Sequence, residues 1–238
     1  ATNKTVDVAQ GKLTFGSNAA INFQNLISNY DLWGALGNSF KYAVLQTILA
    51  IFICSLAGFA FELYHDKKKD AVFTVLLLAM MIPAVATMIP LFTMISKMGL
   101  LNSAWGFMLP TLSTPFLIMM FRNNSRNFPI DVMEAARLDG LSEFRIFVRM
   151  YMPMMKATYA AAAVITFMNA WNAYLWPKVI MTDPNAQTMP MLIANMSAGY
   201  TVDYGMLMMG VLFCSIPTMI VFFVLQKQFA EGITGSVK

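Results

Sequence analysis

The sequence predicts an all-α integral membrane protein with about five spanning helices. Of its 238 residues, 58% are hydrophobic and only 12% are charged, and the mean hydropathy is +0.60. These values lie well outside those of an ordinary soluble domain. Several apolar runs reach the roughly 20 residues that a helix needs to cross the hydrocarbon of a bilayer. None of these runs alternates apolar and polar residues, as the strands of a transmembrane barrel would.

Five segments have the length and composition of a spanning helix. They are residues 42–64, 72–95, 104–121, 158–179 and 206–225. Pro83 and Pro90 lie in the second segment, and Pro110 and Pro115 lie in the third. Each proline frees a backbone carbonyl, so we expect both segments to be bent. The small residues 160–163 in the fourth segment would let a neighbouring helix approach closely.

The placement of Lys and Arg predicts the topology, because basic residues in short loops favour the cytoplasmic side. With the basic runs after the first and third segments inside, eleven Lys and Arg residues lie on the cytoplasmic side and five outside. We therefore expect an extracytoplasmic segment, residues 1–38, and a membrane domain, residues 39–238. The membrane domain would carry a cytoplasmic loop at 122–156, an external loop at 181–204 and a cytoplasmic tail at 227–238.

The outer position of residues 1–38 raises a question, because no spanning segment precedes them in this chain. We expect a sixth, N-terminal helix upstream of residue 1. A cleaved signal sequence would produce the same topology. The segment itself is amphipathic in part, so it is expected to lie along the outer surface.

Several classes of function lack their characteristic residues. The sequence contains no GxxxxGK[ST] phosphate loop, no HExxH and no CxxC, and it has a single histidine. We therefore predict no catalytic residue, no metal site and no ATP bound by a Walker motif on this chain. The net charge of +4 follows from the basic inner side and does not indicate nucleic acid. Cys54 and Cys214 lie inside predicted spans, where buried apolar packing is their simplest role.

Between the third and fourth segments lies the charged stretch EAARLDGLSEFRIFVRMYMP, residues 134–153. Pro129 and Asp131 suit the start of a helix, and Gly140 can adopt the left-handed cap that ends one. Ser142 is a suitable N-cap for a second helix. On that helix four apolar residues share one face and two arginines share another: Phe144, Phe147, Val148 and Tyr151, and Arg145 and Arg149. The pattern favours a cytoplasmic helix-turn-helix, called the finger below, although a solvated loop with helical propensity would also fit it.

The finger resembles the EAA loop of permeases of ATP-binding-cassette importers. That pattern reads EAA, three residues, Gly, nine residues, Ile, one residue, Leu-Pro. Here residues 134–136 are EAA, Gly140 follows after three residues, and Pro153 closes the pattern. Met150 and Met152 stand where Ile and Leu are usual. Two further features resemble the carbohydrate branch, the maltose-type permeases: NAWNAYLWP in the fourth segment and the tail FAEGITGSVK.

The resemblance implies a type I importer fold in the cytoplasmic (inner) membrane of a bacterium or archaeon. It implies as partners a second, related permease, two ATPase subunits, an extracytoplasmic sugar-binding protein and membrane lipid, with no nucleic acid. The chain would carry no cofactor, whereas ATP and Mg would bind the ATPase subunits. The residues implied in ATPase coupling are Glu134, Ala135, Ala136, Asp139 and Gly140. Those implied in a tail contact are Gly232, Gly235 and Ser236.

For the substrate pathway we single out Asn169, Asn172 and Trp176, which would share one face of a continuous helix. Amides match sugar hydroxyls and an indole ring can stack on a sugar. The asparagines could instead link helices to each other, or the partner permease could supply the sugar contacts. A permease for a non-sugar solute remains an alternative. An ion-coupled transporter fits less well, because the only ionisable residues in the predicted spans are Glu62 and Lys178, both near span ends.

Overall fold

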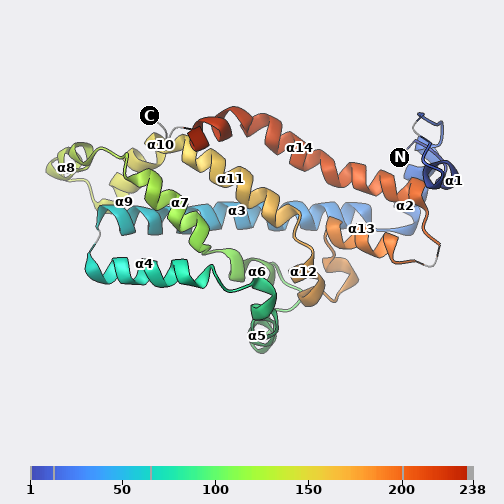
Figure 1. The fold of residues 1–238 in the computed structure, drawn as a ribbon, viewed down its shortest axis with the longest axis horizontal. Helices are drawn as coiled ribbons and strands as arrows, with labels where there is room; N and C mark the ends of the chain where they lie inside the picture. The colour runs from blue at the N-terminus through green and yellow to red at the C-terminus, as the bar shows by residue number, and fades with distance from the viewer. Residues whose placement is uncertain (1, 13, 65, 200, 235–238) are drawn as a thin grey trace. The chain divides into compact units, whose positions relative to one another are not determined.

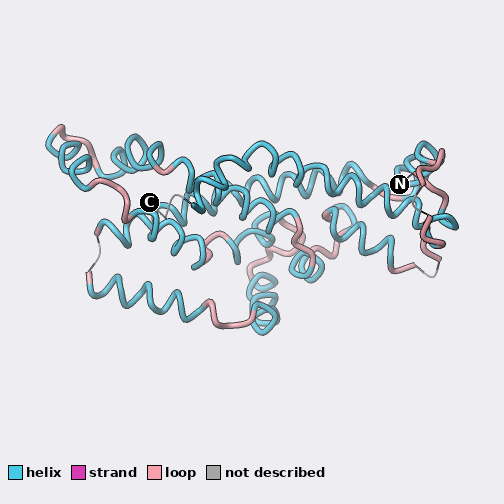
Figure 2. Tube along the Cα trace, turned by 45° about the horizontal axis from the view of Figure 1, so that its top comes forward, coloured by secondary structure: helices cyan, strands magenta, loops and turns pink. Residues whose placement is uncertain are grey.

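The computed structural model describes residues 2–12, 14–64, 66–199 and 201–234. In this part of the chain the regular structure is helical, and Figure 2 shows helices joined by loops without a strand. The elements, in chain order (Figure 1), are α1 (Thr5–Ala9), α2 (Ala19–Asn29), α3 (Leu32–Leu63), α4 (Lys67–Ala79), α5 (Ala84–Lys97), α6 (Ala104–Met108), η1 (Leu109–Thr111), α7 (Pro115–Ser125), α8 (Ile130–Leu138), α9 (Glu143–Ile146), the π-helical turn η2 (Phe147–Tyr151), α10 (Met152–Met154), α11 (Lys156–Trp171), α12 (Leu175–Ile180), η3 (Pro184–Ala186), α13 (Met189–Ser197) and α14 (Tyr204–Thr234).

Within the part of the chain that the structure describes, two helices are individually long and apolar enough to cross a membrane: α3, and α14 over Tyr204–Val224. Both begin before the expected residues 42 and 206, because an aspartate caps each N-terminus. The Asp31 carboxylate accepts a hydrogen bond from the backbone N–H of Gly34 at 2.9 Å. The Asp203 carboxylate accepts one from the N–H of Met206 at 3.0 Å. Each bond satisfies a donor that the first helical turn would otherwise leave unpaired.

The second and third expected spans are both broken, as their prolines predicted. Helices α4 and α5 are bent by 104° at a break that contains Pro83. The segment Ala104–Thr111 and helix α7 are bent by 51°, and Pro115 is the first residue of α7. If each bent pair is counted as one span, the described residues hold up to four candidate spans.

The fourth expected span, residues 158–179, is not one helix. Helix α11 ends at Trp171, residues 172–174 are not helical, and α12 begins at Leu175. Pro177 explains the break, because in a continuous helix its ring would clash with the carbonyl group of Ala173. In the first turn of α12 the missing N–H of proline carries no penalty.

The described residues fall into two compact units, which are considered separately. One unit is drawn from Ala1–Val44, Phe92–Phe107 and Met168–Phe223, and the other from Leu45–Leu91, Met108–Phe167 and Val224–Lys238. In the first unit the Ser39 hydroxyl accepts a hydrogen bond from the N–H of Met189 at 2.7 Å, at the start of α13. This short helix lies within residues 181–204, the range of the expected external loop.

In the second unit, α3 and α7 approach each other at Gly58. A Cβ atom built on Gly58 would lie 2.6 Å from Cβ of Phe121, so only glycine fits there. At the ends of the same helices, the Arg122 guanidinium donates to Glu62 at 3.1 Å and to Asp70 at 2.6 Å. Together these contacts pack α3, the start of α4, and α7.

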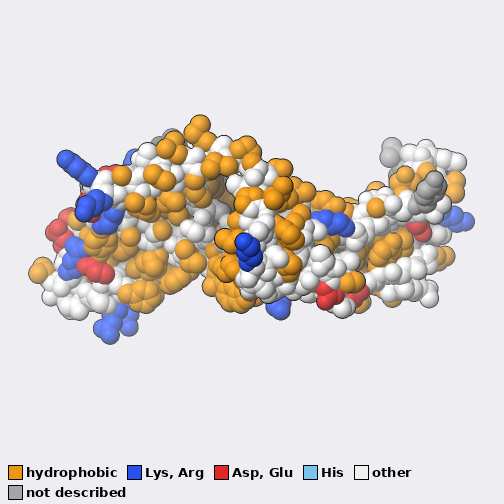
Figure 3. Space-filling model, turned by 90° about the horizontal axis from the view of Figure 1, so that it is seen from below, with side chains coloured by type: hydrophobic (Ala, Val, Ile, Leu, Met, Phe, Trp, Pro, Cys, Tyr) orange, Lys and Arg blue, Asp and Glu red, His pale blue; other side chains and the backbone are white. Residues whose placement is uncertain are grey.

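Hydrophobic side chains are widespread on the face of the molecule shown in Figure 3. The exposed residues include long runs on α14, such as Met219, Ile220, Phe222, Phe223 and Val224. Apolar surface of this extent suits contact with lipid or with another membrane subunit.

Candidate functional site

The finger is a helix-turn-helix, as its sequence predicted. Gly140 follows α8 with a φ of +77°, the left-handed conformation that ends a helix. Its N–H donates to the carbonyl group of Arg137 at 3.0 Å, and the N–H of Leu141 donates to that of Ala136 at 3.0 Å. These two bonds form a Schellman cap, which makes the turn sharp and satisfies carbonyl groups at the end of α8.

The second helix of the finger differs from the expected regular helix. Ser142 occupies the N-cap position of α9, but no side-chain capping bond forms there. The π-helical turn η2 follows α9, and a π turn changes the angular spacing of side chains. Of the four residues expected on one apolar face, Phe147 and Tyr151 are buried, whereas Phe144 is 58% exposed and Val148 is also exposed.

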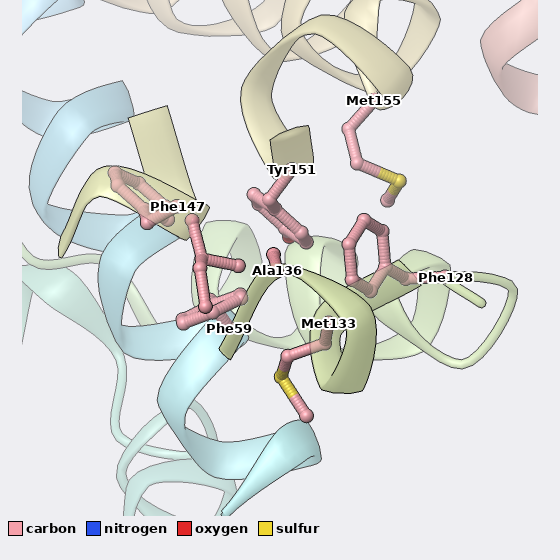
Figure 4. Close-up of a cluster of buried hydrophobic side chains, with 8 residues drawn as sticks. Phe59, Phe128, Met133, Ala136, Phe147, Tyr151 and Met155 are labelled. Atoms are coloured by element: carbon pink, nitrogen blue, oxygen red, sulfur yellow. The ribbon is translucent and has the colours of Figure 1, made fainter. Parts of the chain in front are cut away.

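An aromatic and methionine cluster lies under the finger (Figure 4). Its buried side chains come from α3, the α7–α8 connection, α8, and the run from α9 to the residue after α10: Phe59, Phe128, Met133, Ala136, Ile146, Phe147, Tyr151 and Met155. The ring of Phe59 lies 4.9 Å from that of Tyr151 and 5.3 Å from that of Phe147. Aromatic pairs of this kind add about 0.5–1.5 kcal/mol each beyond their burial. The cluster therefore attaches both helices of the finger to α3.

The structure separates the five predicted coupling residues into two groups. Ala136 is only 4% exposed and belongs to the cluster, so its small side chain packs within the chain itself. The other four are exposed: Glu134, Ala135, Asp139 and Gly140. Leu138, which our sequence reasoning missed, is 90% exposed beside them. The sequence signal for Leu138 was an apolar residue at an otherwise polar helix end. In the structure Leu138 gives the exposed tip of the finger an apolar contact point.

A cluster of three polar side chains, also missed from the sequence, lies at the turn of the finger. The Arg137 guanidinium donates to the Glu143 carboxylate at 2.8 Å and to the Tyr64 hydroxyl at 3.2 Å. The Tyr64 hydroxyl donates to the same carboxylate. Hydrogen bonds from Arg137 and then from Tyr64 hold the pKa of Glu143 below its ordinary value.

A cavity of about 160 Å³ opens beside the finger, between α3, α7 and α8. Its lining includes Glu62 and Arg126, which approach to 3.5 Å, and the side chain of Ser125. The Ser125 hydroxyl lies 2.7 Å from that of Tyr151.

Asp66 caps helix α4. Its carboxylate accepts hydrogen bonds from the N–H groups of Lys68 and Lys69, and the bond from Lys69 is the main reason that the pKa of Asp66 is lowered.

The three predicted substrate-pathway residues do not share one helical face, because the break at 172–174 separates them. Asn169 is exposed near the end of α11, and Asn172 is exposed in the break. The Asn172 amide donates to the carbonyl group of Met168 at 2.9 Å. Trp176 is half-buried in α12 and donates to the carbonyl group of Gly106 at 3.1 Å. The predicted face was therefore wrong, although both amides are exposed at the break.

Of the predicted tail contact, Gly232 lies within α14, and Gly235 and Ser236 lie outside the described residues. Among the residues that the structure describes, no group of three or more His, Cys, Asp or Glu side chains could hold a metal ion.

A membrane chain of bent and broken helices that presents a capped finger has the architecture of an importer permease. The chain belongs to the family of binding-protein-dependent transport system inner membrane components, whose model matches residues 50–235. It is therefore a permease component of an ATP-binding-cassette importer and is not itself an enzyme, since the ATPase of such importers is a separate subunit.

Relatives and solved structures agree with this membership. The chain is 40% identical over 237 residues to the lactose transport system permease protein LacG of Rhizobium radiobacter, covering 100% of this chain and 87% of that protein. It is 33% identical over 202 residues to the arabinooligosaccharides transport system permease protein AraQ of Bacillus subtilis (strain 168), covering 84% and 72%. A chain of a bacterial ABC transporter that imports the acidic polysaccharide alginate matches with a TM-score of 0.84 and 19% identity, over 96% of this chain and 86% of that chain. This last likeness shows the type I importer fold.

Proposed function

We propose that this permease carries a sugar or an oligosaccharide across the cytoplasmic membrane of a bacterium or archaeon, by alternating access powered by ATP. Family membership supports an importer, and the relative LacG, named for lactose transport, supports a carbohydrate substrate. The observation that carries the proposal is the exposed tip of the finger, held by the Schellman cap in the spacing of an EAA loop.

In this proposal the chain pairs with a second permease in the membrane and crosses the membrane several times. Two ATPase subunits, which bind ATP and Mg, contact the finger at Glu134, Ala135, Asp139 and Gly140. Ala136 supports that contact indirectly, by packing α8 against the buried cluster under the finger. An extracytoplasmic sugar-binding protein delivers the substrate. The contact must differ between the open and closed states of the ATPases, because only differential binding can shift the permease between two conformations.

The break after α11 is the proposed place of sugar contact on this chain. The exposed amides of Asn169 and Asn172 can hydrogen-bond hydroxyl groups, and interrupted membrane helices expose backbone polar groups to a substrate. The indole N–H of Trp176 already donates within the chain, so its role would be to stack. Asn172→Ala should raise the KM for uptake about fivefold to thirteenfold, because the loss of one hydrogen bond costs about 1–1.5 kcal/mol of binding free energy. Asn123→Ala, which removes an exposed amide on α7, is the control; unchanged uptake kinetics of Asn172→Ala would exclude this contact.

The main test uses the full importer, expressed with its genomic neighbours and reconstituted in nanodiscs. ATP hydrolysis is measured with and without binding protein loaded with lactose or an oligosaccharide, in the wild type and in the Glu134→Ala, Gly140→Pro double variant. We expect sugar-stimulated hydrolysis that the double variant loses. Asp131→Asn, which removes an exposed carboxylate on α8, should leave stimulation intact. Stimulation by a non-sugar solute instead would support the alternative permease, and normal stimulation of the double variant would refute coupling through the finger.

A further inference from the structure

We propose that Tyr64, Arg137 and Glu143 form a brace, which fixes the angle of the finger and transmits its movement to α3. They are positioning residues for import, since none of them needs to touch sugar or nucleotide. The inference rests on the proposed function of the finger. It adds that α3 is the first spanning helix to which the finger transmits its movement.

The three side chains come from three different elements. Arg137 is the penultimate residue of α8, Glu143 is the first residue of α9, and Tyr64 follows the last residue of α3. The bond between Arg137 and Glu143 therefore closes the turn at Gly140, and the two bonds to Tyr64 attach that turn to α3. The Schellman cap alone would set the turn without fixing its direction relative to the span.

The chemistry of the three groups suits a rigid connection. A guanidinium is planar and can bind two acceptors at a fixed angle, as Arg137 does with the carboxylate and the phenol. Its charge also lies 5.5 Å from the centre of the Tyr64 ring, and Lys69 lies 5.9 Å from the same centre. The Lys69 ammonium also donates to the carbonyl group of Tyr64, so the backbone of Tyr64 is itself held in place. The ring of Phe59, one turn earlier in α3, meets that of Tyr64 edge-on at 5.8 Å and leads into the buried cluster.

Stability alone does not explain this arrangement. An ion pair as exposed as that of Arg137 and Glu143 contributes little to the free energy of unfolding. The aromatic cluster beneath it already holds the finger to α3 by burial. What the brace adds is a fixed orientation at the surface, where the cluster leaves the turn exposed. Its removal should therefore alter coupling more than it alters unfolding.

The first measurement is a distance between spin labels on the finger and on α3. In a Cys54→Ala, Cys214→Ala background, labels are placed at Ile130→Cys, at the start of α8, and at Leu56→Cys, both exposed. We expect one narrow distance distribution in the reconstituted importer, which Glu143→Gln and Tyr64→Phe each broaden. Asp131→Asn, with the same charge change on the same finger, should leave the distribution narrow.

The second measurement is the uptake of sugar per ATP hydrolysed in the same variants. Glu143→Gln and Tyr64→Phe should lower this ratio about fivefold, the lower end of usual coupling factors between sites. Basal hydrolysis, copurification with the ATPase subunits and the unfolding temperature should stay near those of Asp131→Asn.

Either measurement can overturn the proposal. Distributions as narrow as in the control would show that no brace exists, and a broadened distribution with unchanged uptake per ATP would show that it transmits nothing. Loss of copurification with an unchanged distribution would assign the residues to ATPase docking instead. If the wild type shows no sugar-stimulated hydrolysis, the proposed function fails, and the distance distribution still decides whether the brace exists.

Discussion

The substitution Gly58→Ala should loosen the packing of α3 on α7. A methyl group at this position would lie 2.6 Å from Cβ of Phe121 and 2.8 Å from the backbone nitrogen of Arg122. Carbon atoms in contact normally lie about 3.5–4.0 Å apart, so the helices would have to separate by roughly 1 Å. Overpacking of this kind costs about 1–3 kcal/mol of folding free energy.

Gly37→Ala provides a matched control within the same helix. No atom lies within 4 Å of a Cβ built on Gly37, so the added methyl group meets open space. Alanine also favours a helix over glycine by about 1 kcal/mol at either position. The difference between the two variants therefore isolates the overpacking cost at Gly58.

Thermal unfolding of the reconstituted importer, followed by the reactivity of the buried Cys54 thiol, provides the assay. Cys54 is buried in α3 near Gly58, and its thiol becomes reactive when α3 loosens. With about 2–4 °C per kcal/mol for a chain of this size, Gly58→Ala should unfold about 2–12 °C below Gly37→Ala. Equal unfolding temperatures would refute the close approach of α3 and α7 on which this reasoning depends.

Three further predictions concern the turn of the finger, the external loop and pH. In Gly140→Ala the new methyl group meets no steric contact, but the residue must keep a φ of +77°, which costs about 1–2 kcal/mol of free energy. Amide exchange at the end of α8 should therefore rise about fivefold to thirtyfold, and unchanged exchange would contradict the left-handed cap. The Asn102 side chain accepts a hydrogen bond from the N–H of Thr182 at 2.6 Å, so Asn102→Ala should raise the amide exchange rate of Thr182. Asn102→Asp keeps an acceptor and should leave the Thr182 amide protected, and equal exchange in the two variants would argue against the bond. The hydrogen bond from Arg137 lowers the pKa of Glu143 from an ordinary value of 4.5, so the brace is complete above that value and is lost as the pH falls through the lower folded pKa. The spin-label distribution should therefore broaden only at a pH below 4.5, and a distribution independent of pH would count against the pair.

The turn of the finger was predictable because it depends on neighbouring residues. A glycine that follows a short amphipathic helix can adopt positive φ at low cost, and the structure places Gly140 there. Pro83 likewise marked the break between α4 and α5, since a proline acts on the turn of helix that precedes it. Local chemistry of this kind can be read from a single sequence.

The break after α11 was missed even though its signal was present. Hydrophobicity runs through residues 158–179, and a criterion of length and composition therefore merges two helices. The position of Pro177 argued for an end near Ala173, four residues earlier. The start of α3 was also misplaced, because the apolar run that a criterion of length and composition detects begins at residue 42, whereas the capping carboxylate of Asp31 starts the helix earlier.

The brace and the burial of Ala136 were beyond sequence reasoning. Tyr64 lies 73 residues from Arg137 and 79 from Glu143, and no local pattern links such positions. Ala136 has the same side chain as Ala135, and only the packing of α8 on the aromatic cluster makes one buried and the other exposed. Contacts between distant segments require the fold itself.

The π-helical turn η2 makes the finger tolerant of a change in length. Such a turn holds one residue more than an α-helical turn, and the flanking helices keep their directions around it. Deleting one of the outward residues Val148 or Arg149 would leave Phe147 and Tyr151 three positions apart, still on one face of an ordinary helix. A one-residue deletion within α8 would instead rotate every later side chain by about 100°. A one-residue deletion at η2 should therefore disturb the packing of the finger less than one in α8.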